Sequence, residues 1–144
     1  MANRPRVTIF TDGSCWGNPG PGGWAAILKY GKNKREISGG ENATTNNRME
    51  LRAALEALRA LTEACQVTLY TDSEYLKRGI TEWMPGWKRR NWRRKGGKLA
   101  NADLWKKLDE EISRHEIIWN WVRGHAGNPM NERVDKLAKK AIPK

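Results

Sequence analysis

The stretch Val7–Asp12, which reads VTIFTD, and its echo Val67–Asp72, which reads VTLYTD, decide the fold of this chain. They lie sixty residues apart, match at four positions and are similar at the other two. Both have the character of β-strands, and both end in Thr-Asp. The chain between them does not repeat, and sixty residues are too long for a solenoid repeat. We therefore interpret the pair as two separate strands with the same local structural requirement, and not as units of a repeat protein.

An antiparallel meander is predicted from the first of these strands onward. The stretch Gly17–Gly23 is rich in Gly and Pro and predicts a loop, because no helix or central strand tolerates that composition. Strands are expected at Trp24–Tyr30 and Arg35–Gly39, on either side of Gly31–Lys34. So short a connection containing Gly favours a hairpin, and the first three strands then form a meander.

A crossover connection is predicted between the meander and the second Thr-Asp strand. Apolar residues recur with helical spacing from Met49 to Leu61, and Cys65 closes this segment before the strand Gln66–Asp72. A strand–helix–strand connection of this length implies a right-handed crossover to a parallel neighbour.

The rest of the chain alternates between helices and one more strand. A helix from Ser73 to Ile80 is expected to break near Pro85-Gly86, and a further helix is expected around Leu104–Ile112. A strand follows at Glu116–Val122, then a last helix at about Asn131–Ala141. The sequence thus predicts an α/β fold: a mixed five-stranded sheet, three strands antiparallel and two parallel, with helices on both faces.

Composition excludes several classes of protein. The chain has 38% apolar residues and eight tryptophans, which is too much for a disordered chain. The longest apolar run, Trp24–Leu28, is far shorter than the ~18 residues of a membrane span. Met1–Arg6 does not resemble a secretory signal, so we expect a cytoplasmic protein. Cys15 and Cys65 fit neither a metal knuckle nor a disulfide framework. One domain over residues 1–144 is expected.

Positive charge is concentrated in one segment. Of a net charge of +11, the segment Lys88–Lys98 contributes seven Lys and Arg residues and no acid. This pattern predicts binding to a polyanion, although a solvated surface loop is the ordinary alternative. Trp83, Trp87 and Trp92 flank or interrupt the run, and aromatic rings beside cations suit nucleic acids. Trp83 and Trp87 also share one helix face, so we expect at least one of them in the core.

The two Thr-Asp strands are predicted to bring two carboxylates together. If the strands are parallel neighbours, their spacing of about 4.8 Å sets Asp12 beside Asp72 at the carboxyl edge of the sheet. Adjacent carboxylates repel, so such a pair either has one raised pKa or holds a cation. The alternative is that each aspartate caps the turn or helix that follows it.

Two further acidic residues are candidates for the same site. Glu50 lies in the first turn of the predicted helix, where Asn47-x-x-Glu50 also resembles a capping box. Asp135 lies in the last helix, where an exposed ion pair with Lys139 is its ordinary explanation. Hard divalent cations prefer oxygen ligands, so the four carboxylates have the chemistry to hold one or two such ions.

The two histidines have different settings. His125 lies in a Gly-flanked loop before Asp135 and is a candidate proton shuttle. His115, just before a predicted strand, has no such setting and receives no role.

With these residues assembled, the chain resembles bacterial type 1 ribonuclease H from about Val7 to Ala141. The resemblance rests on the motifs TDGSC at Thr11–Cys15, NPGPGG at Asn18–Gly23, TTNNRMEL at Thr44–Leu51, TDS at Thr71–Ser73, and GHAG at Gly124–Gly127 followed by NERVD at Asn131–Asp135. It implies a ribonuclease H-like fold. It also implies an endonuclease that hydrolyses the RNA strand of an RNA/DNA hybrid with little sequence preference, and we expect a monomer.

The resemblance also implies roles for individual residues. The ligands of two Mg²⁺ or Mn²⁺ ions would be Asp12, Glu50, Asp72 and Asp135, and cleavage would leave 5′-phosphate and 3′-hydroxyl ends. His125 would assist proton transfer or product release. Contacts to the hybrid near the metals would come from Cys15, Asn18, Thr45, Asn46, Asn47 and Glu74. A basic helix-loop protrusion at about 81–99 would grip the DNA strand through Trp83, Trp87, Lys88, Arg89, Arg90, Trp92, Arg93 and Arg94.

One departure and two alternatives accompany this interpretation. Glu74 stands where the family commonly has glutamine, which adds negative charge near the metals. A non-catalytic duplex-binding module would explain the basic segment equally well, but acids facing a polyanion weaken binding unless a cation intervenes. Another nuclease or strand-transfer enzyme of the same fold is the second alternative, and the NNRME and GHAG motifs favour the hydrolase over it.

Overall fold

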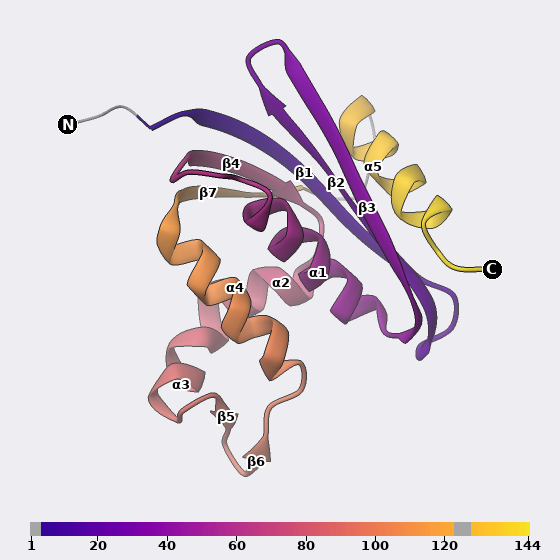
Figure 1. The fold of residues 1–144 in the computed structure, drawn as a ribbon. Helices are drawn as coiled ribbons and strands as arrows, with labels where there is room; N and C mark the ends of the chain where they lie inside the picture. Colours follow the sequence, from indigo (N-terminus) through magenta and orange to yellow (C-terminus); the bar gives the residue numbers. More distant parts are fainter. Residues whose placement is uncertain (1–3, 123–127) are drawn as a thin grey trace.

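The computed structural model describes residues 4–122 and 128–144 and contains a mixed five-stranded sheet (Figure 1). The strand order is β3-β2-β1-β4-β7. The strands are β1 (Arg6–Cys15), β2 (Gly20–Tyr30), β3 (Asn33–Thr44), β4 (Gln66–Thr71) and β7 (Glu116–Trp121). β1, β2 and β3 pair antiparallel, whereas β1–β4 and β4–β7 pair parallel. The predicted meander and mixed sheet are confirmed.

The two Thr-Asp strands are parallel neighbours. Val7 lies opposite Val67 and Phe10 opposite Tyr70, so the offset in sequence is also the register of the sheet. The rings of Phe10 and Tyr70 stack with centroids 4.9 Å apart. The predicted end of the first strand at Asp12 is wrong, because β1 continues to Cys15. Its parallel pairing with β4 nevertheless ends at Phe10 and Tyr70, so Asp12 and Asp72 both lie just beyond the paired part of the two strands.

Helices cover both faces of the sheet, as predicted. They are α1 (Asn46–Arg59), α2 (Glu74–Arg78), α3 (Met84–Arg89), α4 (Ala102–Arg114) and α5 (Pro129–Lys140). α1 packs on β1 and β2 with α4 against it, and α5 packs on the opposite face of the same strands (Figure 1). Alternate residues of β1 serve the two layers: Ile9 belongs to the core under α1, and Phe10 to the core under α5. No helix among the described residues has the length and apolar character of a membrane span.

The predicted loop Gly17–Gly23 is partly wrong, because β2 already begins at Gly20. A Cβ at Gly22 would lie 2.6 Å from the Thr44 side chain, and one at Gly23 would lie 2.2 Å from the carbonyl oxygen of Ala138. These glycines therefore allow close packing of a strand rather than a turn. The connection to β3 is also shorter than predicted, since only Gly31 and Lys32 separate the strands.

The predicted break at Pro85-Gly86 is also wrong. Both residues lie in α3, where Pro85 occupies the first turn and needs no backbone donor. The irregularity comes earlier, as a π-helical turn over Gly79–Trp83. A Cβ at Gly79 would lie 2.0 Å from the ring of Trp105, so this turn packs tightly on α4. After α3, the chain forms a small ribbon of β5 (Arg93–Arg94) and β6 (Gly97–Lys98).

Candidate active site

Three aspartates interact at the carboxyl edge of β1 and β4. Asp12 is only 7% exposed. Burial raises its pKa to about 8, with further contributions from a hydrogen bond to the Asp135 side chain and from repulsion by Asp72 and Asp135. Since α5 packs on β1, Asp135 reaches this edge from the other end of the chain. The structure thus brings together Asp12, Asp72 and Asp135, which are three of the four predicted carboxylates.

Glu50 joins this group from α1. Burial raises its pKa to about 7; repulsion by Asp72 adds to this rise, and a hydrogen bond with Ser73 opposes it. Asn46 donates a hydrogen bond to Glu50 Oε1 at 3.2 Å. A Cβ at Gly13 would lie 2.5 Å from the backbone N of Glu50, so only glycine permits this close approach of α1 to β1. Glycine in TDGSC therefore sets the distance between Asp12 and Glu50.

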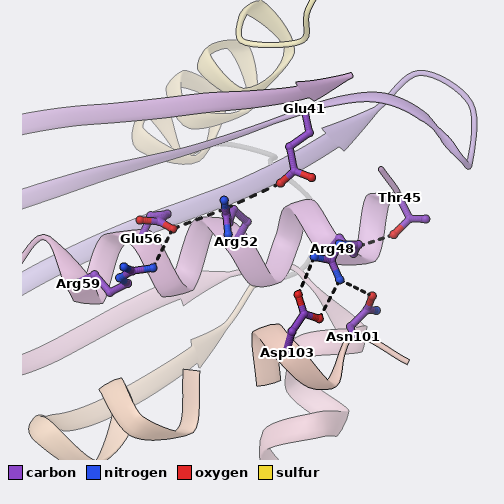
Figure 2. A network of polar contacts seen from close by, with 8 residues as sticks. All are labelled: Glu41, Thr45, Arg48, Arg52, Glu56, Arg59, Asn101 and Asp103. Atoms are coloured by element: carbon purple, nitrogen blue, oxygen red, sulfur yellow. Dashed lines mark hydrogen bonds and ion pairs between the residues drawn. The ribbon is translucent and has the colours of Figure 1, made fainter. Parts of the chain in front are cut away.

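The capping-box interpretation of Glu50 is wrong, and Asp72 is not the N-cap of α2. The N-cap of α1 is Thr45, whose Oγ1 accepts from the Arg48 backbone N–H at 3.2 Å (Figure 2). The N-cap of α2 is Ser73, whose Oγ accepts from the Leu76 backbone N–H at 3.0 Å. Each helix start is satisfied by a neighbouring hydroxyl, which leaves both carboxylates for the cluster.

The ordinary explanation of Asp135 holds, but it is not the whole explanation. Lys139 Nζ lies 3.1 Å from Asp135 Oδ2, which is the predicted ion pair one turn along α5. Asp135 nevertheless also hydrogen-bonds with Asp12. This contact helps to raise the pKa of Asp12, so Asp135 belongs to the group around Asp12 as well as to an ion pair on α5.

The chemistry of this cluster fits a hard divalent cation. Asp12 Oδ2 is buried and has no hydrogen-bond partner among residues 4–122 and 128–144. Carboxylate oxygens are the ligands that such cations prefer, and a cation would offset the repulsion of Asp12 by Asp72 and Asp135. Within the part of the chain that the structure describes, no group of three or more His, Cys, Asp or Glu side chains has the arrangement to hold a metal ion.

The predicted substrate-contact residues near the cluster come from the end of β1, the β1–β2 turn and the starts of α1 and α2. Asn18 Oδ1 accepts from the Asn46 backbone N–H at 3.2 Å, which ties the β1–β2 turn to α1. The Cys15 thiol donates to the carbonyls of Gly20 and Thr44 at 3.5 and 3.6 Å. The side chains of Asn47 in α1 and of Glu74 in α2 are exposed.

The basic segment Lys88–Lys98 leaves the body of the protein at α3. Its five predicted contact cations, namely Lys88, Arg89, Arg90, Arg93 and Arg94, are exposed. Trp83 and Trp92 are half-buried, whereas Trp87 is only 8% exposed. Trp87 packs between Trp83 and Trp105, with ring centroids 5.6 and 5.2 Å away. The core explanation holds for Trp87, whose ring has no free face for a base.

The histidines contribute little to the described site. His125 lies in residues 123–127, outside the described residues. His115 is buried, and its Nδ1 accepts from the Cys65 backbone N–H at 3.0 Å. Burial lowers the pKa of His115, which suits a neutral structural histidine.

Two polar residues close to the cluster were not predicted as part of it. Ser73 hydrogen-bonds Glu50 as well as capping α2. Arg48 makes contacts to Asp103 and Asn101 at the start of α4 (Figure 2). Their positions inside the TDS and TTNNRMEL motifs were the available signal, but neither residue type indicates a metal ligand.

Known proteins resemble this chain over almost its whole length. The family model described as RNase H matches residues 4–143. A ribonuclease H of Hahella chejuensis is 62% identical over 92% of this chain and 90% of its own, and one of a Bradyrhizobium species is 56% identical over 99% and 93%. Among solved structures, LC9-RNase H1, a type 1 RNase H with the type 2 active-site motif, covers 99% of this chain and 74% of its own, with 37% identity and a TM-score of 0.89.

Proposed function

This chain belongs to the ribonuclease H family, and we propose that it hydrolyses the RNA strand of RNA/DNA hybrids as a metal-dependent endonuclease with little sequence preference. The observation that carries the proposal is the buried carboxylate cluster around Asp12, in a protein of net charge +11. Acids placed where a polyanion must approach are useful only if cations lie between them. A non-catalytic binding module would have no use for them.

The proposed metal ligands are the four carboxylates Asp12, Glu50, Asp72 and Asp135, which would hold two Mg²⁺ or Mn²⁺ ions. When bound, the ions supply an activated water and stabilise the leaving 3′ oxygen, which gives 5′-phosphate and 3′-hydroxyl ends. The protein's own task is placement. Gly13 sets the approach of Glu50 to Asp12, Ser73 holds Glu50, and Lys139 holds Asp135. We assign His125 the role of assisting proton transfer.

The proposed hybrid interface has two parts. Beside the carboxylates, the polar groups Cys15, Asn18, Asn46, Asn47 and Glu74 would contact 2′-hydroxyls, which distinguish RNA from DNA. The Thr45 hydroxyl accepts from Arg48 and keeps its proton for a DNA phosphate. Further away, the exposed cations of Lys88–Lys98 would bind the DNA backbone, which carries no sequence information. We place the enzyme in the cytoplasm as a monomer.

The proposal is tested with labelled RNA/DNA, RNA/RNA and DNA/DNA duplexes, each with Mg²⁺ and with EDTA. We expect cleavage of the RNA strand of the hybrid only, and only with the metal. Asp12→Asn and Asp72→Asn should abolish cleavage while hybrid binding survives, because the chemistry requires the charge. The matched control is Glu110→Gln on α4, an exposed acid outside the cluster, which should cleave like the wild type. Near-normal turnover in either aspartate variant would contradict the ligand assignment.

A further inference from the structure

Arg48 links the start of α1 to the start of α4. Its Nη1 lies 3.1 Å from Asp103 Oδ1, and its Nη2 lies 3.0 Å from Asp103 Oδ2, which is a two-pronged ion pair (Figure 2). Nη1 also donates to Asn101 Oδ1 at 3.1 Å. Only the planar fork of arginine makes this set of contacts. We call the contacts of Arg48 with Asp103 and Asn101 the clamp. Arg48 lies two residues before Glu50, so one turn of α1 carries both the clamp and a carboxylate of the cluster.

Asn101 is the point at which the chain turns from the basic segment into α4. Its backbone is left-handed, with φ of 61°, and it occupies the N-cap position of α4. Its side chain is held at both ends: Oδ1 accepts from Arg48, and Nδ2 donates to the Tyr75 hydroxyl at 3.0 Å. Trp105 Nε1 donates to the same hydroxyl at 3.1 Å. The turn is therefore fixed by side chains from α1, α2 and α4.

The same network reaches the other end of the basic segment. The Tyr75 ring packs on Trp83 and Trp105, with centroids 5.8 and 5.4 Å away. Trp87, in α3, lies between those two tryptophans, and α3 leads directly into the basic segment. β5 and β6 pair with each other and not with the five-stranded sheet. The orientation of the segment thus depends on how its two ends are anchored, together with the packing of Trp92 on the core and the ion pair of Lys88 with Asp109 on α4.

We propose that Arg48 is a positioning residue that fixes the basic segment Lys88–Lys98 relative to the carboxylate cluster. The inference rests on the proposed function, because it assigns the segment to the DNA strand and the cluster to the RNA strand. Through Asp103 and Asn101, Arg48 sets the separation between the place where the duplex is held and the place where it is cut. Without the clamp, the cations remain but no longer meet the phosphates in register.

A direct contact between Arg48 and a phosphate is the competing explanation, and Asp103 separates the two. If Arg48 bound a phosphate itself, removing Asp103 would release the guanidinium and add one unit of net positive charge, so the hybrid would bind more tightly. If Arg48 positions the segment, removing either partner breaks the same clamp. Asp103→Ala should then weaken binding in spite of the more favourable net charge.

The test compares Arg48→Ala, Arg48→Lys, Asp103→Ala and the Arg48→Ala/Asp103→Ala double variant in hybrid cleavage. We expect each to raise KM about three- to tenfold, with kcat nearly unchanged, since coupling changes of this kind are modest and the carboxylates stay in place. The double variant should be no worse than the single ones. Arg48→Lys should not rescue, because it keeps the charge and loses the fork. Amide hydrogen exchange should rise between residues 86 and 100.

The matched control is Arg52→Ala, which removes the same charge from the same helix. Arg52 pairs instead with Glu41 and Glu56 (Figure 2). It should leave KM unchanged. An unchanged or lower KM in Asp103→Ala, or an equal rise in Arg52→Ala, would overturn the proposal. Because wild type and Arg52→Ala must cleave hybrid in the same assay, their inactivity would instead contradict the proposed function.

Discussion

At the scale of a single residue, the buried carboxylate of Asp12 lowers the free energy of unfolding when it is ionised. Burial raises its pKa to about 8 in the folded protein, against about 4 in an unfolded chain. Between these values the folded state binds more protons than the unfolded state, so stability falls as pH rises. The contribution of Asp12 to the free energy of unfolding is therefore largest below about pH 4, and it is lost by about pH 8.

Asp12→Asn should therefore stabilise the metal-free protein at pH 8. We expect a rise of about 3–8 °C in Tm in EDTA, which corresponds to about 1–2 kcal/mol in a domain of this size. At pH 3 the gain should vanish, because the aspartate is then largely neutral in both the folded and the unfolded state. Thermal melts of both proteins across this pH range check the prediction, with Glu110→Gln as control. Parallel curves for wild type and Asp12→Asn would refute it.

At the scale of elements, the contact between β1 and α1 sets the geometry of the cluster. The chain passes the backbone of α1 so closely at Gly13 that a methyl group there would lie 2.5 Å from both the Met49 carbonyl carbon and the Glu50 nitrogen. Backbone atoms cannot rotate aside, so the helix as a whole must shift.

Gly13→Ala should consequently separate Asp12 from Glu50. We expect a decrease of about 1–3 kcal/mol in unfolding free energy from overpacking. The kcat on hybrid should fall at least about tenfold, because small displacements of catalytic groups are costly. Urea unfolding and steady-state kinetics measure the two effects. Gly31→Ala is the control for a loss of stability without displacement of the cluster: no atom lies within 4 Å of a Cβ there, but the left-handed backbone with φ of 58° is strained by alanine. It should lower stability and retain kcat.

The sequence predicts an element correctly where its residue pattern has only one physical explanation. Alternation and the Thr-Asp endings of Val7–Asp12 and Val67–Asp72 predicted a parallel pair, and the sheet register confirms it. Gly22 and Gly23 were assigned to a loop because glycine serves turns and close packing alike, and only the neighbouring chain tells which.

Similar ambiguity affected the candidate site. Glu50 carries both a capping-box spacing and a ligand's chemistry, and only the position of Thr45 as N-cap excludes the first. Arg48 was missed because its partners, Asn101 and Asp103, are more than fifty residues away. Long-range polar pairs leave no periodic signal in a sequence.

At the scale of the whole molecule, the basic segment and the carboxylate cluster occupy different parts of the fold. The cations of Lys88–Lys98 are exposed at the end of α3 and on the β5–β6 ribbon, whereas the acids of the cluster are partly or fully buried at the sheet edge. Under the proposed function, this arrangement separates the residues that hold the duplex from those that cut it.

Replacing Arg89, Arg90, Arg93 and Arg94 with Ala should therefore affect binding and spare chemistry. Hybrid affinity should fall chiefly at low salt, and the plot of log K against log[salt] should flatten by about 0.7–0.9 for each phosphate that the protein no longer neutralises. KM should rise while kcat changes little. The control is the double variant Lys29→Ala/Lys32→Ala. It removes two exposed cations at the end of β2 and in the β2–β3 turn, outside the basic segment, and should keep the wild-type slope. An unchanged slope with collapsed kcat would place the segment in the catalytic apparatus.

The arrival of Asp135 on α5 gives the enzyme an order of assembly during translation. β1, α1 and β4 leave the ribosome early with their three carboxylates, and the cationic ribbon follows, but α5 emerges after every other described element and must fold back onto β1 and β2. A nascent chain that stops before residue 128 lacks Asp135, one of the four proposed metal ligands, although the other three and the basic segment have already been made. We therefore expect nuclease activity to begin only after α5 has been made and has packed on β1 and β2.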